Sequence, residues 1–413
     1  MTKKNKLRHS EYYDLQDCFD KLYAKSKHGD VFTNLMEIIS TEENIRLAYR
    51  NIKRNSGSQT GGVDKLNIKD IEKLSAEKLV EIIQRKFRNY KPKPVKRVEI
   101  PKPNGKTRPL GIPTIIDRLV QQCVLQVLEP ICEAKFHERS NGFRPNRSAE
   151  HALAQCYRMI QRQDLHFVVD IDVKGFFDNV NHSKLIRQMW TLGIRDKQLI
   201  CIIKAMLKAP IDCVAIQFQI NTVLYNRLNG RLEKQGSVTR KYIAEHYGKS
   251  KMLRYISGEP LCPIGYVQTK NPMYKKKKIC KYTAEGREEI HRNLKFDETV
   301  ISVLHTLART YLPNRSVEYM DNRVSLYAAQ YGKCAVTGKV LWIDEIHCHH
   351  KKPISQGGTD EYKNLIIVHI DVHKLIHATK PETIQAYLNK IKPNKSQLEK
   401  INKLRVLAGN SAI

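Results

Sequence analysis

Four histidines toward the carboxyl end of the chain have the types and spacing of a metal-dependent hydrolytic site. The two stretches that carry them read Ile346-His-Cys-His-His350 and Val372-His-Lys-Leu-Ile-His377. His349 and His350 are adjacent on an expected strand, so their side chains point to opposite faces. His373 and His377 are four residues apart on an expected helix, so they share one face and can bind the same ion. One strand histidine can therefore complete a ligand set while the other holds a water molecule.

The number of available ligands separates a catalytic site from a structural one. Structural zinc sites use four protein ligands, whereas catalytic sites keep one position open. Three histidine ligands, with His350 not needed as a fourth, therefore match the ligand number of a catalytic site. The alternative is a structural zinc held by the histidines together with Cys348, which would give a fold without catalysis.

This order of His-His, Gly357-Gly358, Asn364-Leu, Val-His and Ile-His resembles the HNH nucleases, and the two-histidine helix is most similar to their colicin branch. The resemblance implies a two-stranded hairpin and a helix around one divalent ion, either magnesium, zinc or another transition metal. It implies that His350 is the general base that activates water for attack on DNA and that Asn364 orients this base. The implied metal ligands are His349, His373 and His377.

A second, structural zinc is found in some HNH relatives, and this chain departs from them there. Cys334 keeps one of the four positions, but Thr337, His369 and Val372 stand at the others. We therefore expect no structural zinc. No two of the ten cysteines are spaced Cys-x-x-Cys, and we expect all ten to be reduced thiols.

The composition indicates a polyanionic partner. The 413 residues include 72 Lys and Arg against 42 Asp and Glu, a formal charge of +30. Nucleic acid is the commonest partner for such an excess, and every apolar run is too short and too charged for a membrane. No apolar stretch follows the basic start of the chain, so we expect a cytoplasmic protein. An apolar fraction of 41% excludes a disordered chain.

The amino-terminal half carries the motifs of a polymerase. Residues 86–108 hold nine Lys and Arg against one Glu, and Val95–Ile100 followed by Asn104-Gly105 predicts a hairpin that grips phosphates. The segments that resemble, in order, the reverse transcriptases of group II introns are the Gly-rich turn 55–64 and residues 100–113, 117–122, 141–148 and 172–178. The resemblance implies that Lys102 and Arg108 contact phosphates and that Asp172 is the first catalytic carboxylate.

A departure from that family predicts the loss of polymerisation. The family's two-metal site needs a strand Asp, here Asp172 on an expected central strand over 167–173, and a second hairpin-borne Asp pair. No Asp-Asp dipeptide occurs in this sequence. The palm therefore resembles a truncated one, and we expect no polymerase activity.

A third region resembles the maturase (thumb and X) segment of the same family. Residues 263–268 and 279–291 carry the resemblance, which implies binding of intron RNA. Lysines 275–278 and Arg287 lie close in sequence to Tyr274 and Tyr282, so charges can neutralise phosphates while rings stack on bases. The alternative is an ordinary basic helical surface. The cationic residues that we expect to bind RNA here are Lys275, Lys276, Lys277, Lys278 and Arg287.

These observations predict an α+β multidomain protein of the group II intron-encoded type. The expected parts are a helical extension (1–90), reverse transcriptase fingers and partial palm (91–210), a helical maturase-like region (211–319) and a ββα-metal HNH domain with a helical tail (320–413). The leading hypothesis is metal-dependent cleavage of double-stranded DNA together with intron RNA binding. The rivals are a non-enzymatic splicing cofactor with a passenger nuclease, and a decayed reading frame that folds in part. Oligomeric state and target sequences stay open.

Overall fold

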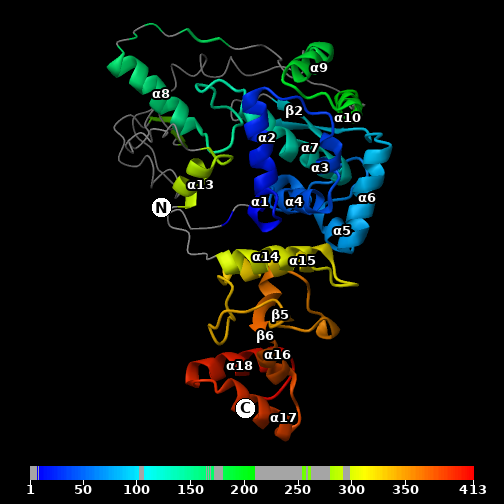
Figure 1. Ribbon diagram of the computed structural model, residues 1–413, viewed down its shortest axis with the longest axis vertical. Helices are drawn as coiled ribbons and strands as arrows, with labels where there is room; N and C mark the ends of the chain where they lie inside the picture. Colours follow the sequence, from blue (N-terminus) through cyan, green and yellow to red (C-terminus); the bar gives the residue numbers. More distant parts are fainter. Residues whose placement is uncertain are drawn as a thin grey trace.

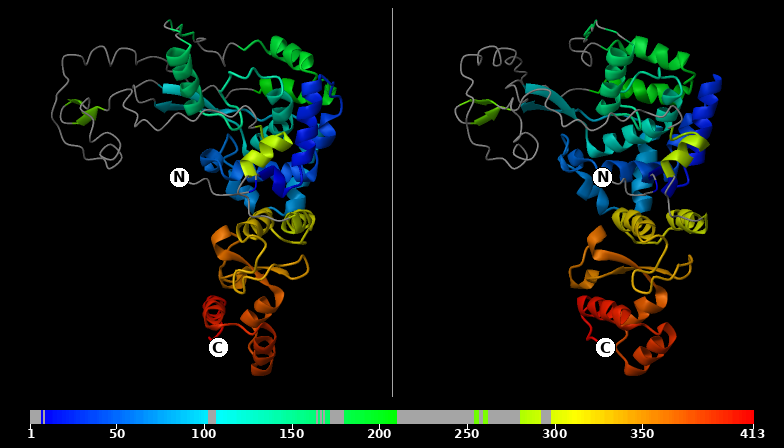
Figure 2. Two further views of the ribbon diagram at one scale, coloured as in Figure 1. Left: turned by 60° about the vertical axis from the view of Figure 1, so that its left-hand side comes forward. Right: turned by 90° about the vertical axis from the view of Figure 1, so that its left-hand side faces the viewer.

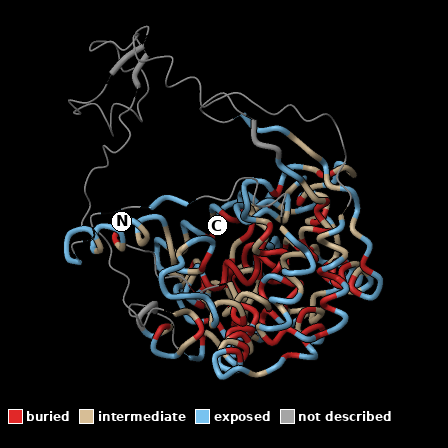
Figure 3. Tube along the Cα trace, turned by 90° about the horizontal axis from the view of Figure 1, so that it is seen from above, coloured by how far each residue is buried: buried red, intermediate tan, exposed pale blue. Residues whose placement is uncertain are grey.

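Helices predominate in the computed structural model, which describes residues 7, 9–101, 107–163, 165, 167, 169–171, 180–209, 254–256, 259–261, 280–291 and 298–413. In these residues the strands form two-stranded antiparallel sheets, so the fold is α+β and multidomain. A layer of α14 (Glu298–Arg309) and α15 (Val317–Ala329) separates an amino-terminal body from a carboxyl-terminal body (Figures 1 and 2). Buried residues gather inside these parts beneath an exposed shell (Figure 3).

The amino-terminal body is built around one long helix, α7 (Ile115–Glu133). Helices α2 and α4 pack against it, and its inward positions, such as Leu119 and Val127, are fully buried. Residues 35–53 and 68–88 each form two helices, because Thr41 and Ser75 cap a new helix start inside these stretches. The helices of this body besides α7 are α1 (His9–Tyr12), α2 (Gln16–His28), α3 (Leu35–Ile39), α4 (Glu42–Lys53), α5 (Ile68–Glu72), α6 (Ala76–Arg88), α8 (Ala149–Arg162), α9 (His182–Thr191) and α10 (Lys197–Leu207).

The Gly-rich turn at 55–64 lies against the start of α7. Arg118 donates hydrogen bonds to the carbonyls of Gly57 (2.9 Å) and Thr60 (2.5 Å). Gly62 approaches Thr114 so closely that an added Cβ would lie 2.8 Å from the Thr114 Cα, which only glycine avoids. These motif residues therefore join the turn to the helix.

The predicted basic hairpin is confirmed. β1 (Lys96–Pro101) pairs antiparallel with β2 (Thr107–Ile112), from Lys96 opposite Ile112 to Pro101 opposite Thr107. Lys102 lies outside the described residues. The backbone of Arg108 is on β2, and its side chain is not among those described.

The predicted central strand over 167–173 is wrong for the residues that can be compared. The described ones, 167 and 169–171, have no regular secondary structure. The side chains of Phe167, Val169 and Ile171 are 95%, 79% and 83% exposed. A buried strand needs pairing neighbours, and no other strand in the described ranges pairs with this segment. Asp172 lies outside the described residues.

Two of the predicted domain boundaries cross packed elements of the structure. The boundary at 90/91 divides a single core, because α4 and α6 pack against α7. The boundary at 319/320 falls inside α15, which contacts α5 and α6 of the amino-terminal body as well as β6 of the carboxyl-terminal body. Helical periodicity does not reveal that both faces of one helix are covered by different bodies. Between α10 and α14 in the chain the structure describes β3 (Arg254–Ile256), β4 (Glu259–Leu261) and α13 (Ala284–His291).

The carboxyl-terminal body confirms the expected hairpin, helix and helical tail. β5 (Ile346–His350) pairs antiparallel with β6 (Leu365–His369), and α16 (Ile370–His377) follows directly. The tail consists of α17 (Pro381–Ile391) and α18 (Lys395–Leu407), and buried Arg405 of α18 donates to the carbonyls of Leu375 and Ala378 at the end of α16. Of the described helices, none combines the length and apolarity that crossing a membrane requires.

Candidate metal centre and catalytic site

Strand pairing and helix spacing bring the predicted ligands together. His349 lies opposite Ile366 in the β5–β6 ladder, and its side chain faces α16. The ring of His349 lies 5.3 Å from that of His373 and 5.2 Å from that of His377, measured between centroids. The potential ligand atoms of the three histidines all lie within 4.8 Å of one another. The prediction that these three side chains converge is therefore confirmed.

The chemistry of these imidazoles fits a divalent metal ion. His349 is 1% exposed, and its Nε2 is buried without a hydrogen-bond partner. Such an orphaned nitrogen is costly unless a cation accepts its lone pair. Burial, reinforced by neighbouring histidines, lowers the pKa of His349 and of His373 to about 3, and burial also lowers the pKa of His377. All three rings are therefore neutral at neutral pH, as metal binding requires.

A fourth histidine lies beside this cluster. His347 shares the face of His349 because residues two apart on a strand point the same way. Its ring stacks on that of His373 with centroids 3.5 Å apart, and burial lowers the pKa of His347 to about 4. The structure thus places His347 in contact with the cluster.

The side chain of His350 lies on the other face of β5, because adjacent residues on a strand point to opposite faces. Its Nε2 is 2.7 Å from Oδ1 of Asp360, and its ring stacks on Tyr319 with centroids 5.3 Å apart. Burial tends to raise the pKa of Asp360, but hydrogen bonds from His350 and Ser316 outweigh it and the pKa is lowered. The ionised carboxylate can only accept, so Nε2 of His350 donates to it, which leaves Nδ1 as the nitrogen able to accept a proton.

Asn364 closes the loop that leads out of the histidine strand. Its Oδ1 accepts from the Lys352 amide (2.9 Å), and its Nδ2 donates to the carbonyls of Lys352 (3.0 Å) and Thr359 (2.8 Å). The contact with His350 comes instead from Asp360, which the sequence analysis missed. The available signal was its place between the Gly-Gly turn and Asn364, inside the loop that joins the two strands.

The cysteines of this body do not join the histidines. Cys348 is buried on the strand face opposite His349, and burial raises its thiol pKa to about 12. The group of potential ligands found within the described residues does not include it, which weakens the structural-zinc alternative. The Sγ of Cys334 accepts the backbone N–H groups of Thr337 (3.5 Å) and His369 (3.3 Å).

The predicted RNA contacts are only partly described. Lysines 275–278 lie outside the described residues. Arg287 is on α13, where it forms an ion pair with Asp20 of α2. That ion pair ties α13 to α2, so the Arg287 charge expected to bind RNA already faces a carboxylate.

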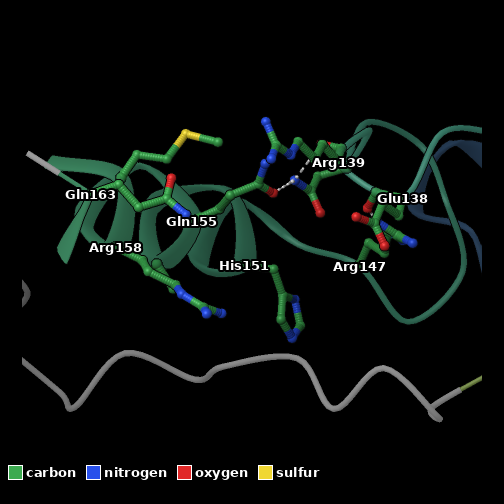
Figure 4. A pocket seen from close by; sticks show the side chains of 10 residues that line it. Glu138, Arg139, Arg147, His151, Gln155, Arg158 and Gln163 are labelled. Atoms are coloured by element: carbon green, nitrogen blue, oxygen red, sulfur yellow. Dashed lines mark hydrogen bonds between the residues drawn. The ribbon is translucent and has the colours of Figure 1, made fainter. Parts of the chain in front are cut away.

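A concave surface away from the histidines lies along α8. The cavity of about 410 Å³ is open at the surface, and Figure 4 shows several cationic side chains around it. Arg144, in the sequence motif beside it, is buried and forms a two-point ion pair with Glu133 (2.8 Å for each bond). The basic residues that line the cavity are Arg139, Arg147, His151 and Arg158.

Comparisons with known proteins agree with both halves of this description. Residues 100–243 match the family model described as "Reverse transcriptase (RNA-dependent DNA polymerase)", and residues 333–379 match "HNH endonuclease". The hairpin, the histidine cluster and α16 all lie within the second match.

Three relatives illustrate the similarity. The chain is 39% identical over 185 residues to the group II intron-encoded protein LtrA of Lactococcus lactis subsp. cremoris, covering 44% of this chain and 29% of that protein. It is 37% identical over 159 residues to the protein YkfC of Escherichia coli (37% and 41% covered). It is 34% identical over 97 residues to nuclear intron maturase 2, mitochondrial, of Arabidopsis thaliana (23% and 12%). The chain thus spans less than half the length of each of these relatives.

Proposed function

We propose that this chain is of the group II intron-encoded type and that its carboxyl-terminal body is a metal-dependent DNA endonuclease serving intron mobility. The proposal is supported by one segment similar to reverse transcriptases, another similar to HNH endonucleases, and relatives named as intron-encoded proteins. The observation that carries the proposal is the separation of two kinds of histidine on β5. His349, with an orphaned buried Nε2, faces two further histidines, while His350 faces a carboxylate. This arrangement fits His349 as a metal ligand and His350 as a general base.

Each of these residues has a separate role in the proposed hydrolysis of DNA. His349, His373 and His377 would hold one divalent ion, which when bound supplies Lewis-acid stabilisation of phosphate charge and of the departing oxygen. His350, with Nε2–H donated to Asp360, accepts a proton from water at Nδ1. Its ring is then a cation beside the Asp360 carboxylate, which stabilises that charge. Tyr319, stacked on the ring, limits its rotation.

Arg315 is the cation best placed to receive the DNA backbone near this site. Its guanidinium lies over the ring of Tyr319, 4.8 Å from the centroid, and its side chain is exposed. Together with Tyr319 and His347, it helps to line a cavity of about 350 Å³ beside β5. We assign Arg315 to binding a phosphate rather than to the chemical step.

A second activity, binding of intron RNA, is proposed for the amino-terminal body and the region 211–319. It is supported by the charge of +30 and by relatives named as intron maturases. Lys102, Arg108 and lysines 275–278 are the proposed contacts. We place the protein in the cytoplasm, with intron RNA and double-stranded DNA as partners and without polymerase activity. The rival, a splicing cofactor with a passenger nuclease, shares the RNA contacts but predicts no cleavage.

The deciding experiment is nicking and cleavage of duplex DNA by the full chain. Protein freed of metal is supplied with Mg²⁺, Mn²⁺, Zn²⁺ or Ni²⁺ in separate reactions, and DNA breaks are counted on a supercoiled plasmid. Metal-dependent breaks that disappear in His350→Ala support the nuclease. Metal binding without any breaks on plasmid or on intron-containing duplexes would favour the rival.

A further inference from the structure

The hairpin loop carries an acidic residue that is hydrogen-bonded to the proposed base. Asp360 lies between the Gly357-Gly358 turn and Asn364 and is half-buried. One carboxylate oxygen, Oδ1, accepts from Nε2 of His350 (2.7 Å), and the other accepts from the Ser316 hydroxyl. Its backbone carbonyl accepts from Nδ2 of Asn322 (2.8 Å). Asp360 is therefore held at three atoms, one of them by His350.

The two anchors of Asp360 belong to α15. Ser316 caps the amino terminus of that helix, and Asn322 lies within the helix. The helix is itself fixed from the opposite side by the amino-terminal body. Lys53 of α4 donates to Oδ1 of Asn322 (3.2 Å), and the fully buried Arg50 pairs with Asp321 at 3.0 Å. A continuous chain of bonds thus runs from α4 through α15 to Asp360 and His350.

We propose that Asp360 is a positioning residue for His350, and that α15, braced by α4, holds Asp360 in place. The proposal rests on the proposed function in taking His350 as the base. The carboxylate fixes which ring nitrogen carries the proton and keeps Nδ1 free. A helix outside the hairpin–helix unit therefore completes the active site, so the amino-terminal body contributes to nuclease geometry without touching DNA at that site.

A merely structural role makes a different prediction. If Asp360 only fastens the loop, its loss would loosen the histidine strand as a whole. Metal binding would weaken together with cleavage, and the damage would add to that of a His350 substitution. If Asp360 acts through His350, its loss has no further consequence once the imidazole is gone. A double-mutant cycle separates these cases.

The test compares Asp360→Ala, His350→Ala and the double variant in the full chain, at saturating Mg²⁺ or Mn²⁺. Asp360→Ala should lower the turnover rate about 10–100-fold with unchanged KM for DNA and unchanged metal affinity, a range typical of outer-shell residues. In the His350→Ala background the same change should lower the turnover rate about twofold or less. Such a small further loss would mean that Asp360 acts on the rate only through His350. Asn322→Leu should lower the rate in the same direction by a smaller factor.

Glu361→Ala is the matched control, because it removes an exposed carboxylate from the adjacent position of the same loop. It should cleave like the wild type. A loss in Asp360→Ala that multiplies fully with His350→Ala, or that appears equally in Glu361→Ala, would overturn the positioning role.

A second measurement does not depend on cleavage. Nitrogen NMR of His350 in the metal-free full chain should show the proton on Nε2, and Asp360→Ala should give a mixture of both tautomers. If the wild type carries the proton on Nδ1, the inference fails even if the protein is a nuclease. If the tautomers behave as expected but no metal supports DNA breaks, the proposed function fails and the contact stands.

Discussion

Without metal, the carboxyl-terminal body should lose stability in mild acid. His349 has its pKa lowered by burial to about 3, whereas an imidazole in the unfolded chain titrates near 6.5. Between these values the unfolded state binds more protons, so the free energy of unfolding rises with pH. The contribution is fully present above about pH 6.5 and is lost as the pH falls toward 3. At pH 5 the difference of about 1.5 pH units from 6.5 corresponds to a loss of about 2 kcal/mol for His349 alone.

The assay is amide hydrogen exchange of peptides covering β5, β6 and α16, expressed as protection factors at pH 7.5 and pH 5. Protection should fall by at least about 30-fold in metal-free wild type, because the 2 kcal/mol counts His349 alone and the lowered pKa values of His373 and His347 act in the same direction. In His349→Gln, which cannot titrate in this range, the pH dependence should become shallower although the protein is less stable overall. Peptides of α2 and α7, remote from the histidines, serve as the internal reference.

Protection that is independent of pH between 7.5 and 5 would refute the reasoning. It would mean that the His349 ring is charged, or already bound to a proton donor, in the folded protein. An equal fall in α7 would point instead to general acid unfolding of the chain.

Further expectations follow from the same contacts. His373→Ala removes one of three ligands, so high metal concentration should partly restore its cleavage, whereas His350→Ala should lose about 10²–10⁴-fold and not be restored. If added metal restored cleavage by His350→Ala but not by His373→Ala, the assignment of base and ligand would be reversed. Arg315→Ala should raise the KM for DNA several-fold with little change in turnover, which steady-state cleavage measures, and a pure turnover defect would contradict it. Primer extension should be absent on RNA and DNA templates, and incorporation abolished by Asp172→Ala would disprove that expectation. Neutralising lysines 275–278 should flatten the salt dependence of RNA binding, since each phosphate contact contributes about −0.9 or less to the log–log slope, and an unchanged slope would make them a solvated face.

The exposed segment around 167–171 shows where local patterning is an incomplete guide. Its alternation of apolar and acidic residues predicts a strand, yet the described part forms no strand and exposes its apolar side chains. Alternation states which face of a strand is apolar, but pairing depends on neighbours that are far away in the sequence. The same limitation applies at the boundary predicted inside α15, whose two faces contact different bodies.

The sequence by itself determined the features that depend on local spacing. Residues four apart on a helix and alternate residues on a strand have fixed directions, so the convergence of His349, His373 and His377 could be predicted before any coordinates. The same applies to the basic hairpin, whose turn residues are contiguous with its strands. The tertiary structure alone decided what surrounds His350. Asp360 comes from the loop, and Tyr319 comes from a helix about thirty residues earlier that the amino-terminal body braces. Such contacts depend on how separate elements pack, and no periodicity in the chain records that packing.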